Sequence, residues 1–513
     1  MTRSSKILKN SAYLYFRMLI VLAASLYTVR VVLNALGVQD LGIYGIAGGM
    51  VAIFAFLNST MTRAAQRFLG LDIGRNDPAA LRRTFNAVLA ANTFIAVLTV
   101  VISLTLGLWL LNYRLEIPSD RLHAANVVLF YSVATTVAMV LRTPYSALII
   151  SHQKMWFFTL TSVVEALLKL GVAFMISHSD DDRLTLYAAL MCGVSWALFI
   201  CYAAFCRVSF PSSRLLFERN PELYRSLLAF TSWSFIGNLA HVFRTHGVNM
   251  LLNVFFGTSL NAAHSVMTQA QGAASQFTSS FELALSPQIY KSYGQGNVEE
   301  VRTLVFIGAK LNFLMLAILV APAIYGMDFI LDLWLGRQLD YLSAFVSWML
   351  ITQLIETLSQ PLMVAAFAAG NIKRYQLAVG GTILLNLPLS WAAFHFGGSP
   401  TSFLYVAFAI QIATFALRVW FLKGMIQLHV RGFMTRVVVP LMLLSTVAIA
   451  IVALVTEVLP SPTSLWSFVK GAIAIEIPLL LGCLFIGFTS AERQSLWKKL
   501  LNARSKLRKN ANS

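Results

Sequence analysis

The sequence predicts an all-α integral membrane protein of about 14 transmembrane helices, arranged as two copies of a six-helix unit and two extra C-terminal helices. Three observations predict this architecture: the composition, the length of the apolar runs, and an internal repeat. Of the 513 residues, 58% are apolar and only 12% are charged, whereas a soluble protein carries about 25% charged residues. The mean hydropathy of +0.72 is typical of a chain that lies mostly in lipid.

The apolar runs are each roughly 20 residues long, the length that spans the hydrocarbon core as a helix. The predicted spans are residues 12–36, 41–62, 87–112, 124–150, 157–177, 184–206, 229–256, 260–285, 303–327, 342–368, 376–396, 402–424, 435–457 and 466–489. The first run lacks the small-residue cleavage pattern of a signal peptide, so we expect it to remain as a span.

Basic residues lie on alternate loops of this topology. With the N-terminus inside, all but one of the cytoplasmic segments are net positive, and every loop on the other side is neutral or negative. Because cytoplasmic segments of membrane proteins carry an excess of Lys and Arg, both termini are predicted to be cytoplasmic. The net charge of +18 therefore indicates orientation and contact with anionic membrane lipids, and it does not indicate nucleic-acid binding.

Three segments of the first half recur in the second half at nearly one offset. The motif VLNALG at 32–37 is echoed by LLNVFFG at 251–257. Gly74, Arg82 and Asn92 match Gly294, Arg302 and Asn312 at an offset of 220, and Pro144 matches Pro361 at an offset of 217. Since this offset covers six helices, an even number, the two copies have the same orientation and are parallel repeats, as in some transporters.

The repeat and the loops define the predicted domains. These are an N-terminal lobe at 1–206, a cytoplasmic linker at 207–228, a C-terminal lobe at 229–424, two extra helices at 425–489 and a basic cytoplasmic tail at 490–513. The linker contains Asn220-Pro221-Glu222, a typical helix start, and we expect a short amphipathic helix on the membrane surface there.

Charged residues inside the predicted spans are the candidates for function, because such groups are costly in lipid and usually face a polar interior. Arg17 and Arg30 lie in the first span, and Arg244 lies in the first span of the second repeat, three residues after His241. Arg63 lies where the second span meets the cytoplasm. Guanidinium groups bind phosphate in a two-point fashion. Converging arginines would therefore make a cationic cavity for a phosphate- or diphosphate-bearing substrate.

Other intramembrane groups are weaker candidates for cavity or ion-coupling roles. They are Glu165, Lys169, His241, Glu282, Lys310 and Glu356. Glu165 and Lys169 are spaced i,i+4 and are expected to pair, whereas Lys310, Arg418 and Lys470 lie near predicted span ends, where snorkelling is an equally good explanation. Pro144 and Pro361 lie within spans and are predicted to be kinks or hinges.

The sequence carries no catalytic constellation. It has no Gly-rich phosphate loop with Lys-Ser/Thr, and its four cysteines lie in apolar runs without metal-ligand spacing. We therefore expect neither an enzyme nor a bound cofactor or metal. A transporter of this kind would draw energy from the membrane potential or from an H⁺ or Na⁺ gradient.

The N-terminal region resembles a known family. Arg30, Leu36-Gly37, Asp40-Leu41-Gly42-Ile43-Tyr44 and Arg67-Phe68-Leu69, with PYSALIISHQK at 144–154 and VVEALLKL at 163–170, resemble Wzx-like polysaccharide-biosynthesis flippases of the multidrug/oligosaccharidyl-lipid/polysaccharide (MOP) exporter superfamily. The resemblance covers roughly residues 5–425.

The resemblance implies a multi-pass protein of the bacterial inner membrane with two lobes in a MATE-like V shape, a cationic cavity and alternating access. It implies a substrate, a polyprenyl-diphosphate-linked oligosaccharide for O-antigen, capsule or exopolysaccharide, that crosses from the cytoplasmic to the periplasmic leaflet. Polymerase or assembly proteins are possible partners. The cavity arginines of the lipid II flippase branch correspond to Arg17, Arg30, Arg63 and Arg244, and the extra helix pair of that branch contributes to a groove for the lipid tail.

Alternatives remain open at this point. One is a MATE-type multidrug or cation antiporter, for which Glu282 and Glu356 would be the important groups; another is a lipid II flippase. A membrane glycosyltransferase or polymerase is disfavoured, because the longest predicted outer loop, 328–341, is too short to hold a catalytic domain.

Overall fold

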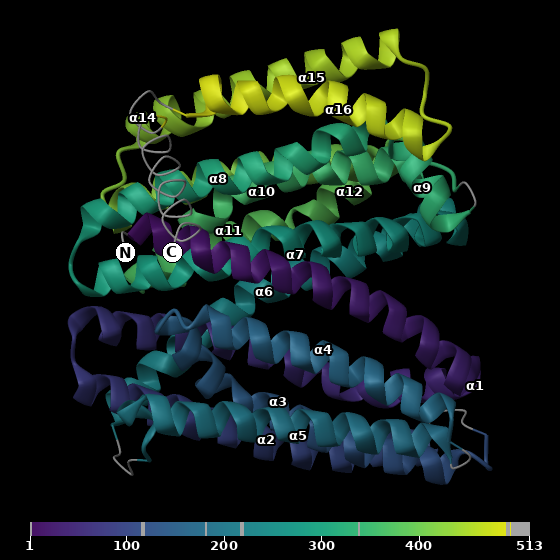
Figure 1. Cartoon of the computed structure of the whole chain (residues 1–513), viewed down its shortest axis with the longest axis vertical. Helices are drawn as coiled ribbons and strands as arrows, with labels where there is room; N and C mark the ends of the chain where they lie inside the picture. Colours follow the sequence, from purple (N-terminus) through teal and green to yellow (C-terminus); the bar gives the residue numbers. More distant parts are fainter. Residues whose placement is uncertain are drawn as a thin grey trace, which may run out of the picture. The chain divides into compact units, whose positions relative to one another are not determined.

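The computed structural model describes residues 3–113, 118–179, 182–215, 220–336, 339–488 and 493. Within these ranges the chain is helical, with turns and bends but no strand. It forms two compact units (Figure 1). Unit 1 comprises Met1–Ile236 and Leu283–Val298, and unit 2 comprises Gly237–Glu282 and Glu299–Ser513. The all-α membrane fold predicted from the sequence is confirmed.

Unit 1 is built from five long helices, a short 3-10 turn and parts of two more helices. They are α1 (Arg3–Arg75), α2 (Pro78–Tyr113), α3 (Leu122–Ser151), α4 (Met155–Ser177), α5 (Arg183–Ser209), η1 (Pro211–Ser213), the start of α6 (Pro221–Phe256) and the end of α7 (Thr258–Gly294). Helix α1 packs on α3 and α4, and α3 packs on α2 and α5.

Unit 2 contains the rest of α6 and α7 and all later helices. They are α8 (Val298–Tyr325), α9 (Met327–Leu335), α10 (Leu342–Ala369), α11 (Lys373–Leu384), α12 (Asn386–His395), α13 (Ser402–Met425), α14 (Val430–Phe433), the π-helical turn η2 (Met434–Val438), α15 (Val439–Val458), α16 (Leu465–Gly482) and the π-helical turn η3 (Cys483–Gly487). Helix α13 packs on α10, α11 and α12, and α15 packs on α16.

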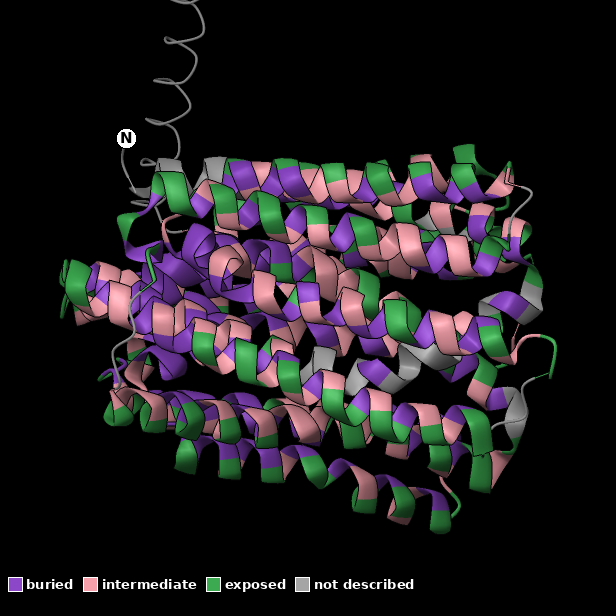
Figure 2. Cartoon of the chain, turned by 90° about the horizontal axis from the view of Figure 1, so that it is seen from below, coloured by how far each residue is buried: buried purple, intermediate pink, exposed green. Residues whose placement is uncertain are grey.

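Eleven of the described helices or helix pairs are long and apolar enough to cross a membrane. Figure 2 shows stripes of buried residues along the helices and exposed residues on their other faces. On α15 and α16 the exposed side chains include Ile449 and Trp466, which are 71% and 69% exposed. Large apolar side chains on an outer face are expected where the solvent is lipid. The chain is therefore a multi-pass membrane protein.

Three of the predicted spans are not among these eleven. They are 41–62, 229–256 and 260–285, which lie in the second part of α1, in α6 and in α7. Helices α6 and α7 are long enough, at 36 and 37 residues, but they carry many polar side chains. The short surface helix expected after Asn220 is not separate. Helix α6 begins there, where Asn220 accepts a hydrogen bond from the Leu223 amide (3.1 Å), and continues to Phe256.

Helix α1 contains the break that the sequence predicts between its first two spans. Gly37 has φ 75° and ψ 175°, a conformation that glycine adopts without a steric penalty. Just beyond it, Asp40 is 6% exposed and its carboxylate lies 2.9 Å from the Arg121 guanidinium, which also contacts Asp182 at 3.1 Å. The kink is therefore fixed by an ion pair from the start of α3.

Replacing Arg121 by Gln is expected to destabilise the protein by about 1–3 kcal/mol, because the buried Asp40 would lose its partner. Burial already raises the pKa of Asp40 above its usual value, and Arg121 opposes that rise. Without Arg121 the folded state binds a proton more readily than the unfolded state, so stability should increase as pH falls from 8 toward 5. Thermal unfolding in detergent across this pH range tests this. The same pH dependence of stability in the variant and in the wild type would contradict it.

The internal repeat is visible in unit 1 as a close crossing of two helix ends. A Cβ atom on Gly74 would lie 2.3 Å from the Lys291 carbonyl oxygen, and one on Gly294 would lie 2.3 Å from the Leu71 carbonyl oxygen. Adding 220 to 71 and 74 gives 291 and 294, so each contact is the copy of the other. This reciprocity is what a two-fold axis between the ends of α1 and α7 requires, and it supports parallel repeats.

Matched arginines also have matching contacts. Arg82 near the start of α2 donates to the carbonyl oxygens of Arg214 and Leu215 (3.1 and 2.9 Å), in the segment after α5 and η1. Arg302 near the start of α8 donates to the Ile426 carbonyl oxygen (3.0 Å), directly after α13. In each repeat, this arginine therefore fixes the chain that follows the last helix.

The glycine crossing gives a direct stability prediction. Gly74→Ala and Gly294→Ala should each cost about 1–3 kcal/mol, because the atom that the new methyl group meets is backbone and cannot rotate away. Gly171→Ala in α4 is the matched control, since nothing lies within 4 Å of its added Cβ and alanine is the better helix former. Equal melting temperatures for the three variants would refute the close crossing.

Candidate functional site

A small polar cavity of ≈ 50 Å³ lies within unit 2, between five helices. It is lined from α6 by Arg244, Thr245 and Val248, from α7 by His264, Met267, Thr268 and Gln271, from α10 by Met349 and Thr352, from α12 by Asn386, and from α13 by Phe403, Leu404 and Ala407. Polar side chains from four helices therefore converge on one space, which α13 closes with apolar side chains.

Two nitrogen donors in this cavity are buried without a hydrogen-bond acceptor among the described residues: Arg244 Nε and Asn386 Nδ2. Buried donors are paired in the large majority of cases, and an unpaired one calls for a ligand, water or ion. His264, which is 4% exposed, lies against the Phe403 ring with the ring centroids 5.8 Å apart. Both unpaired atoms, Arg244 Nε and Asn386 Nδ2, are hydrogen-bond donors. They would suit a ligand with an anionic or carbonyl oxygen.

Asn386 reaches the cavity at a one-residue interruption within a span. The predicted single span 376–396 is divided into α11 and α12 at Leu385, and Asn386 is the first residue of α12. Pro388 has no amide proton and cannot donate to the Leu384 carbonyl oxygen. Leu385 stays in the αR region and its amide still bonds to the Gly381 carbonyl oxygen, so Lys373–His395 remains one span.

Next to this cavity, Glu356 on α10 forms a buried ionic centre. The Arg418 guanidinium of α13 lies 3.4 Å from its carboxylate, and Gln411 of the same helix donates a second hydrogen bond. Arg244 and His241 of α6 are within electrostatic range of the same carboxylate. Arg418 is therefore the direct ionic partner of Glu356 through its terminal nitrogen, and the Nε atoms of both Arg418 and Arg244 have no acceptor among the described residues.

Two residues are buried where snorkelling was an expected explanation. Arg418 and Lys310 are each only 2% exposed. Arg418 reaches Glu356 inside the unit, so its proximity to the end of the span does not bring it to the membrane surface. Position relative to a span end is a poor guide here, because the partner lies on another helix.

Unit 1 has its own ionic centre. Glu165 on α4 pairs with Lys169 (2.7 Å), as the i,i+4 spacing predicts, and with Arg142 on α3 (3.0 Å). The Arg142 guanidinium also lies over the Tyr202 ring of α5, 5.4 Å from its centroid, and Tyr202 is hydrogen-bonded to Thr161 at 2.8 Å. One carboxylate thus faces two cations.

Arg17 of α1 lies near the Glu165 centre of unit 1. Its guanidinium carbon lies 4.8 Å from the centroid of the Phe158 ring, and its Nε is buried without an acceptor among the described residues. Glu165 and Tyr202 are within electrostatic range of Arg17. Arg63, further along α1, likewise has a buried Nε without an acceptor in that part of the chain.

Of the remaining predicted residues, Glu282 is half-buried on α7 and within electrostatic range of Arg418 of the unit 2 centre. Arg30 is exposed on α1. Pro144 and Pro361 are buried within the continuous helices α3 and α10, and a hinge role for them stays a prediction. Three residues of the cavity and the two centres were not singled out from the sequence: Arg142, Gln411 and Asn386. Arg142 lies in the last third of the predicted span 124–150 and was not counted among the intramembrane charges, and the neutral amides carry no charge signal.

Helix α7 presents a polar face. Its exposed positions include Ser265, Gln269, Gly272 and Ser279, whose spacings of four, three and seven residues place them on one side of the helix. Polar groups in lipid are costly, and such faces are found where a helix lines a protein interior or a water-filled space.

Unit 2 also contains an apolar groove of ≈ 660 Å³. It is lined mainly by aliphatic side chains of α8, α10 and α15, including Phe313, Ile351, Leu354, Leu441 and Ile449. Helices α8 and α10 of the second repeat and the extra helix α15 all contribute to the groove. The helices outside the repeat therefore help to form an apolar surface.

No protein-family model and no curated protein sequence matches the chain, but its fold matches solved transporter structures. One is an outward-facing multidrug-resistance MATE family transporter of the MOP superfamily (14% identity, TM-score 0.70, 82% of this chain and 96% of that chain). A second is MATE in its bent conformation (12%, TM-score 0.71, 83% and 96%). A third is a MOP superfamily transporter from Pyrococcus furiosus, whose binding pocket is described as having reverse polarity (12%, TM-score 0.69, 83% and 96%). The chain therefore has the fold of MATE-type transporters of the MOP superfamily.

Proposed function

We propose that this protein is a flippase of the MOP-superfamily fold that moves a polyprenyl-diphosphate-linked oligosaccharide from the cytoplasmic to the periplasmic leaflet of a bacterial inner membrane, by alternating access. The observation that carries the proposal is the set of buried arginine Nε atoms without acceptors among the described residues, at Arg17 and Arg63 in unit 1 and at Arg244 and Arg418 in unit 2. A guanidinium with open donors is suited to a diphosphate.

The charge balance of the unit 1 centre favours an anion over a cation. Glu165 faces both Arg142 and Lys169, so a cationic substrate would meet repulsion there. In unit 2, Glu356 faces Arg418 with Arg244 in range, and a second carboxylate, Glu282, is within electrostatic range of Arg418, so two arginines balance two carboxylates. An inside-negative membrane potential would also drive an anionic headgroup outward, at about 2.3 kcal/mol per charge for 100 mV.

The polar face of α7 and the apolar groove of unit 2 fit the sugar and the prenyl chain of such a substrate. The polar face of α7 suits a sugar, since it offers hydroxyl and amide groups. The apolar groove of unit 2 suits a prenyl chain, since its lining is almost entirely hydrocarbon. A lipid II flippase would use the same features with a different glycan.

A MATE-type antiporter is the second candidate, favoured by the fold of the matched structures and by the buried carboxylate of Glu356. Proteoliposome transport separates the two functions. We expect wild-type protein to flip a fluorescent prenyl-diphosphate oligosaccharide faster than protein-free liposomes and to leave an organic-cation gradient unchanged. Cation exchange for H⁺ or Na⁺, with no lipid flipping, would replace the flippase assignment by the antiporter.

A further inference from the structure

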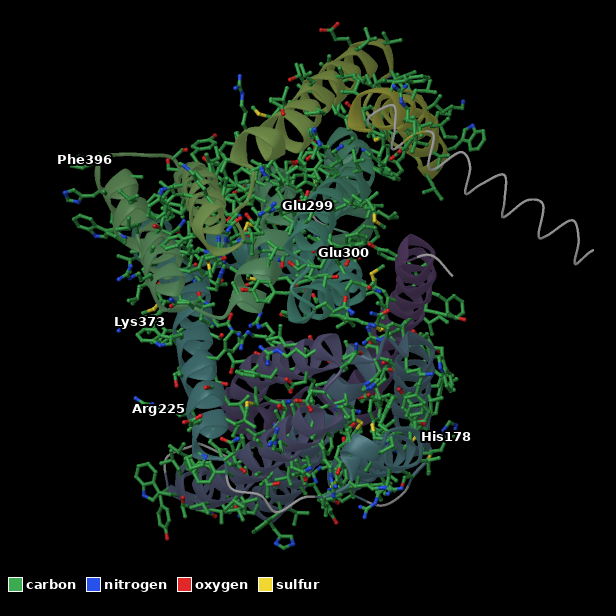
Figure 3. The ribbon with its side chains drawn as sticks, turned by 90° about the vertical axis from the view of Figure 1, so that its left-hand side faces the viewer. His178, Arg225, Glu299, Glu300, Lys373 and Phe396 are labelled. Atoms are coloured by element: carbon green, nitrogen blue, oxygen red, sulfur yellow. The ribbon has the colours of Figure 1, made fainter. Side chains whose placement is uncertain are left out.

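A basic pocket of ≈ 740 Å³ lies at one end of unit 2, apart from the cavity and the ionic centres described above. It is lined by Glu299, Arg302, Thr303 and Phe306 of α8, by Lys423 of α13, and by Leu428, His429, Val430, Arg431, Gly432 and Arg436 of the following loop, α14 and η2. Glu299, labelled in Figure 3, marks the start of α8 at this end.

The pocket has a strong excess of positive charge. Its carboxylate, Glu299, is already paired with Arg302 at 2.7 Å, and Arg302 also holds the Ile426 carbonyl oxygen. Lys423, Arg431 and Arg436 are exposed, and no ion pair of theirs occurs among the described residues. Three cations therefore surround the pocket without a protein counter-charge.

Two devices fix the shape of this pocket. Arg302 fixes the backbone between α13 and α14, as described above, and Phe433 packs on Phe306 with the ring centroids 5.2 Å apart. The π-helical turn η2, Met434–Val438, follows directly and carries Arg436. Single π-turns within α-helices are frequent at functional sites.

The pocket lies at a membrane boundary and leads toward the apolar groove. One apolar span ends at Met425 and the next begins at Val430. Along α8, Phe306 of the pocket and Phe313 of the groove are seven residues apart, which is two turns on one face or about 10 Å. Along the other wall, Arg436 is followed by Val438 and Leu441 of the groove.

We infer that this pocket binds the phosphate headgroup of an anionic phospholipid, with an acyl chain entering the apolar groove of unit 2. A basic pocket between membrane helices is suited to such a headgroup. An adjoining groove of hydrocarbon distinguishes a lipid from a free anion. The headgroup pocket is separate from the arginines of the proposed transport function, whereas the groove is the one offered above to the prenyl chain, so the acyl chain and the prenyl chain would occupy it alternately.

The test is native mass spectrometry and thermal unfolding of the full-length protein with added phosphatidylglycerol, cardiolipin or phosphatidylcholine. We expect the anionic lipids to be retained and to raise the melting temperature, and the triple variant Lys423→Gln, Arg431→Gln, Arg436→Gln to bind them at least 10-fold more weakly. The matched control is Lys154→Gln, Arg207→Gln, Arg225→Gln, which removes three exposed basic residues from unit 1.

Further measurements distinguish a phospholipid from free phosphate and from a prenyl phosphate as the ligand of this pocket. Equal weakening in the two triple variants would show a diffuse charge effect and overturn the site. Displacement of the lipid by millimolar inorganic phosphate would show a free-anion site. Retention of a prenyl phosphate in place of phosphatidylglycerol or cardiolipin, abolished in the first triple variant, would assign the pocket to the prenyl lipid and overturn the phospholipid.

Discussion

Replacing Arg418 by methionine is expected to lower the free energy of unfolding by about 3–5 kcal/mol, since this is the cost of removing one partner of a buried ion pair. Arg418 is almost fully buried, and its guanidinium is 3.4 Å from the Glu356 carboxylate. The variant would leave that carboxylate in a low-dielectric interior with only the Gln411 hydrogen bond and more distant cations. Chemical or thermal unfolding in detergent measures the loss.

The double variant Arg418→Met, Glu356→Gln provides the internal check, because it removes both charges and should recover most of the stability. Lys169→Met is the matched control in unit 1. Lys169 is 38% exposed and Glu165 keeps Arg142, so the loss should be below about 1 kcal/mol. If the Arg418 single variant is as stable as the Lys169 variant, the ion pair has no structural role.

The second large effect is expected on binding. Arg244→Gln should weaken the affinity for a prenyl diphosphate by about 10- to 100-fold, as a charge-assisted hydrogen bond contributes about 1.5–3 kcal/mol. Arg244→Lys keeps the charge but loses the two-point geometry, and we expect an intermediate affinity. Fluorescence binding titrations in detergent provide the values.

Arg225→Gln is the control for this series, because Arg225 lies on the same helix, α6, but is exposed near its start (Figure 3). It carries the same change of charge and should leave the affinity within about two-fold. Equal losses for Arg225→Gln and Arg244→Gln would attribute the effect to overall charge, and no loss for Arg244→Gln would remove Arg244 from the site.

The helices and their order could be predicted from the sequence because apolar run length is set by bilayer thickness. The break at Gly37 could be located as well, since glycine is favoured where the backbone is kinked. Gly74 and Gly294 could be matched through the repeat, but they lie between predicted spans and their close crossing was not predicted. The continuity of α6 from Asn220 could not be predicted from the sequence. The proline and the charged turn there predict a separate surface helix, whereas the helix continues from them directly to Phe256.

The candidate site was only partly predictable, because its groups come from different helices. Arg244 and Glu356 stand out in a sequence as charges in apolar runs. Their surroundings depend on neutral residues that the hydropathy and charge pattern of the sequence does not identify. These are Gln411 on α13 and Asn386 at the start of α12, two residues before Pro388. Arg142 was missed for a related reason: its partner Glu165 lies on the next helix, and the sequence pattern does not connect the two positions.

The central claim, recognition of a diphosphate-linked lipid by buried arginines, is tested most directly by flipping of a fluorescent prenyl-diphosphate oligosaccharide in proteoliposomes. Wild type, Arg17→Gln, Arg244→Gln and Arg225→Gln would be compared at equal reconstitution and equal folded fraction. The account predicts fast flipping by the wild type and Arg225→Gln, and at least a 10-fold slower rate for Arg17→Gln and Arg244→Gln. Wild-type protein that leaves this lipid in its original leaflet, or arginine variants that flip it at the wild-type rate, would contradict the account.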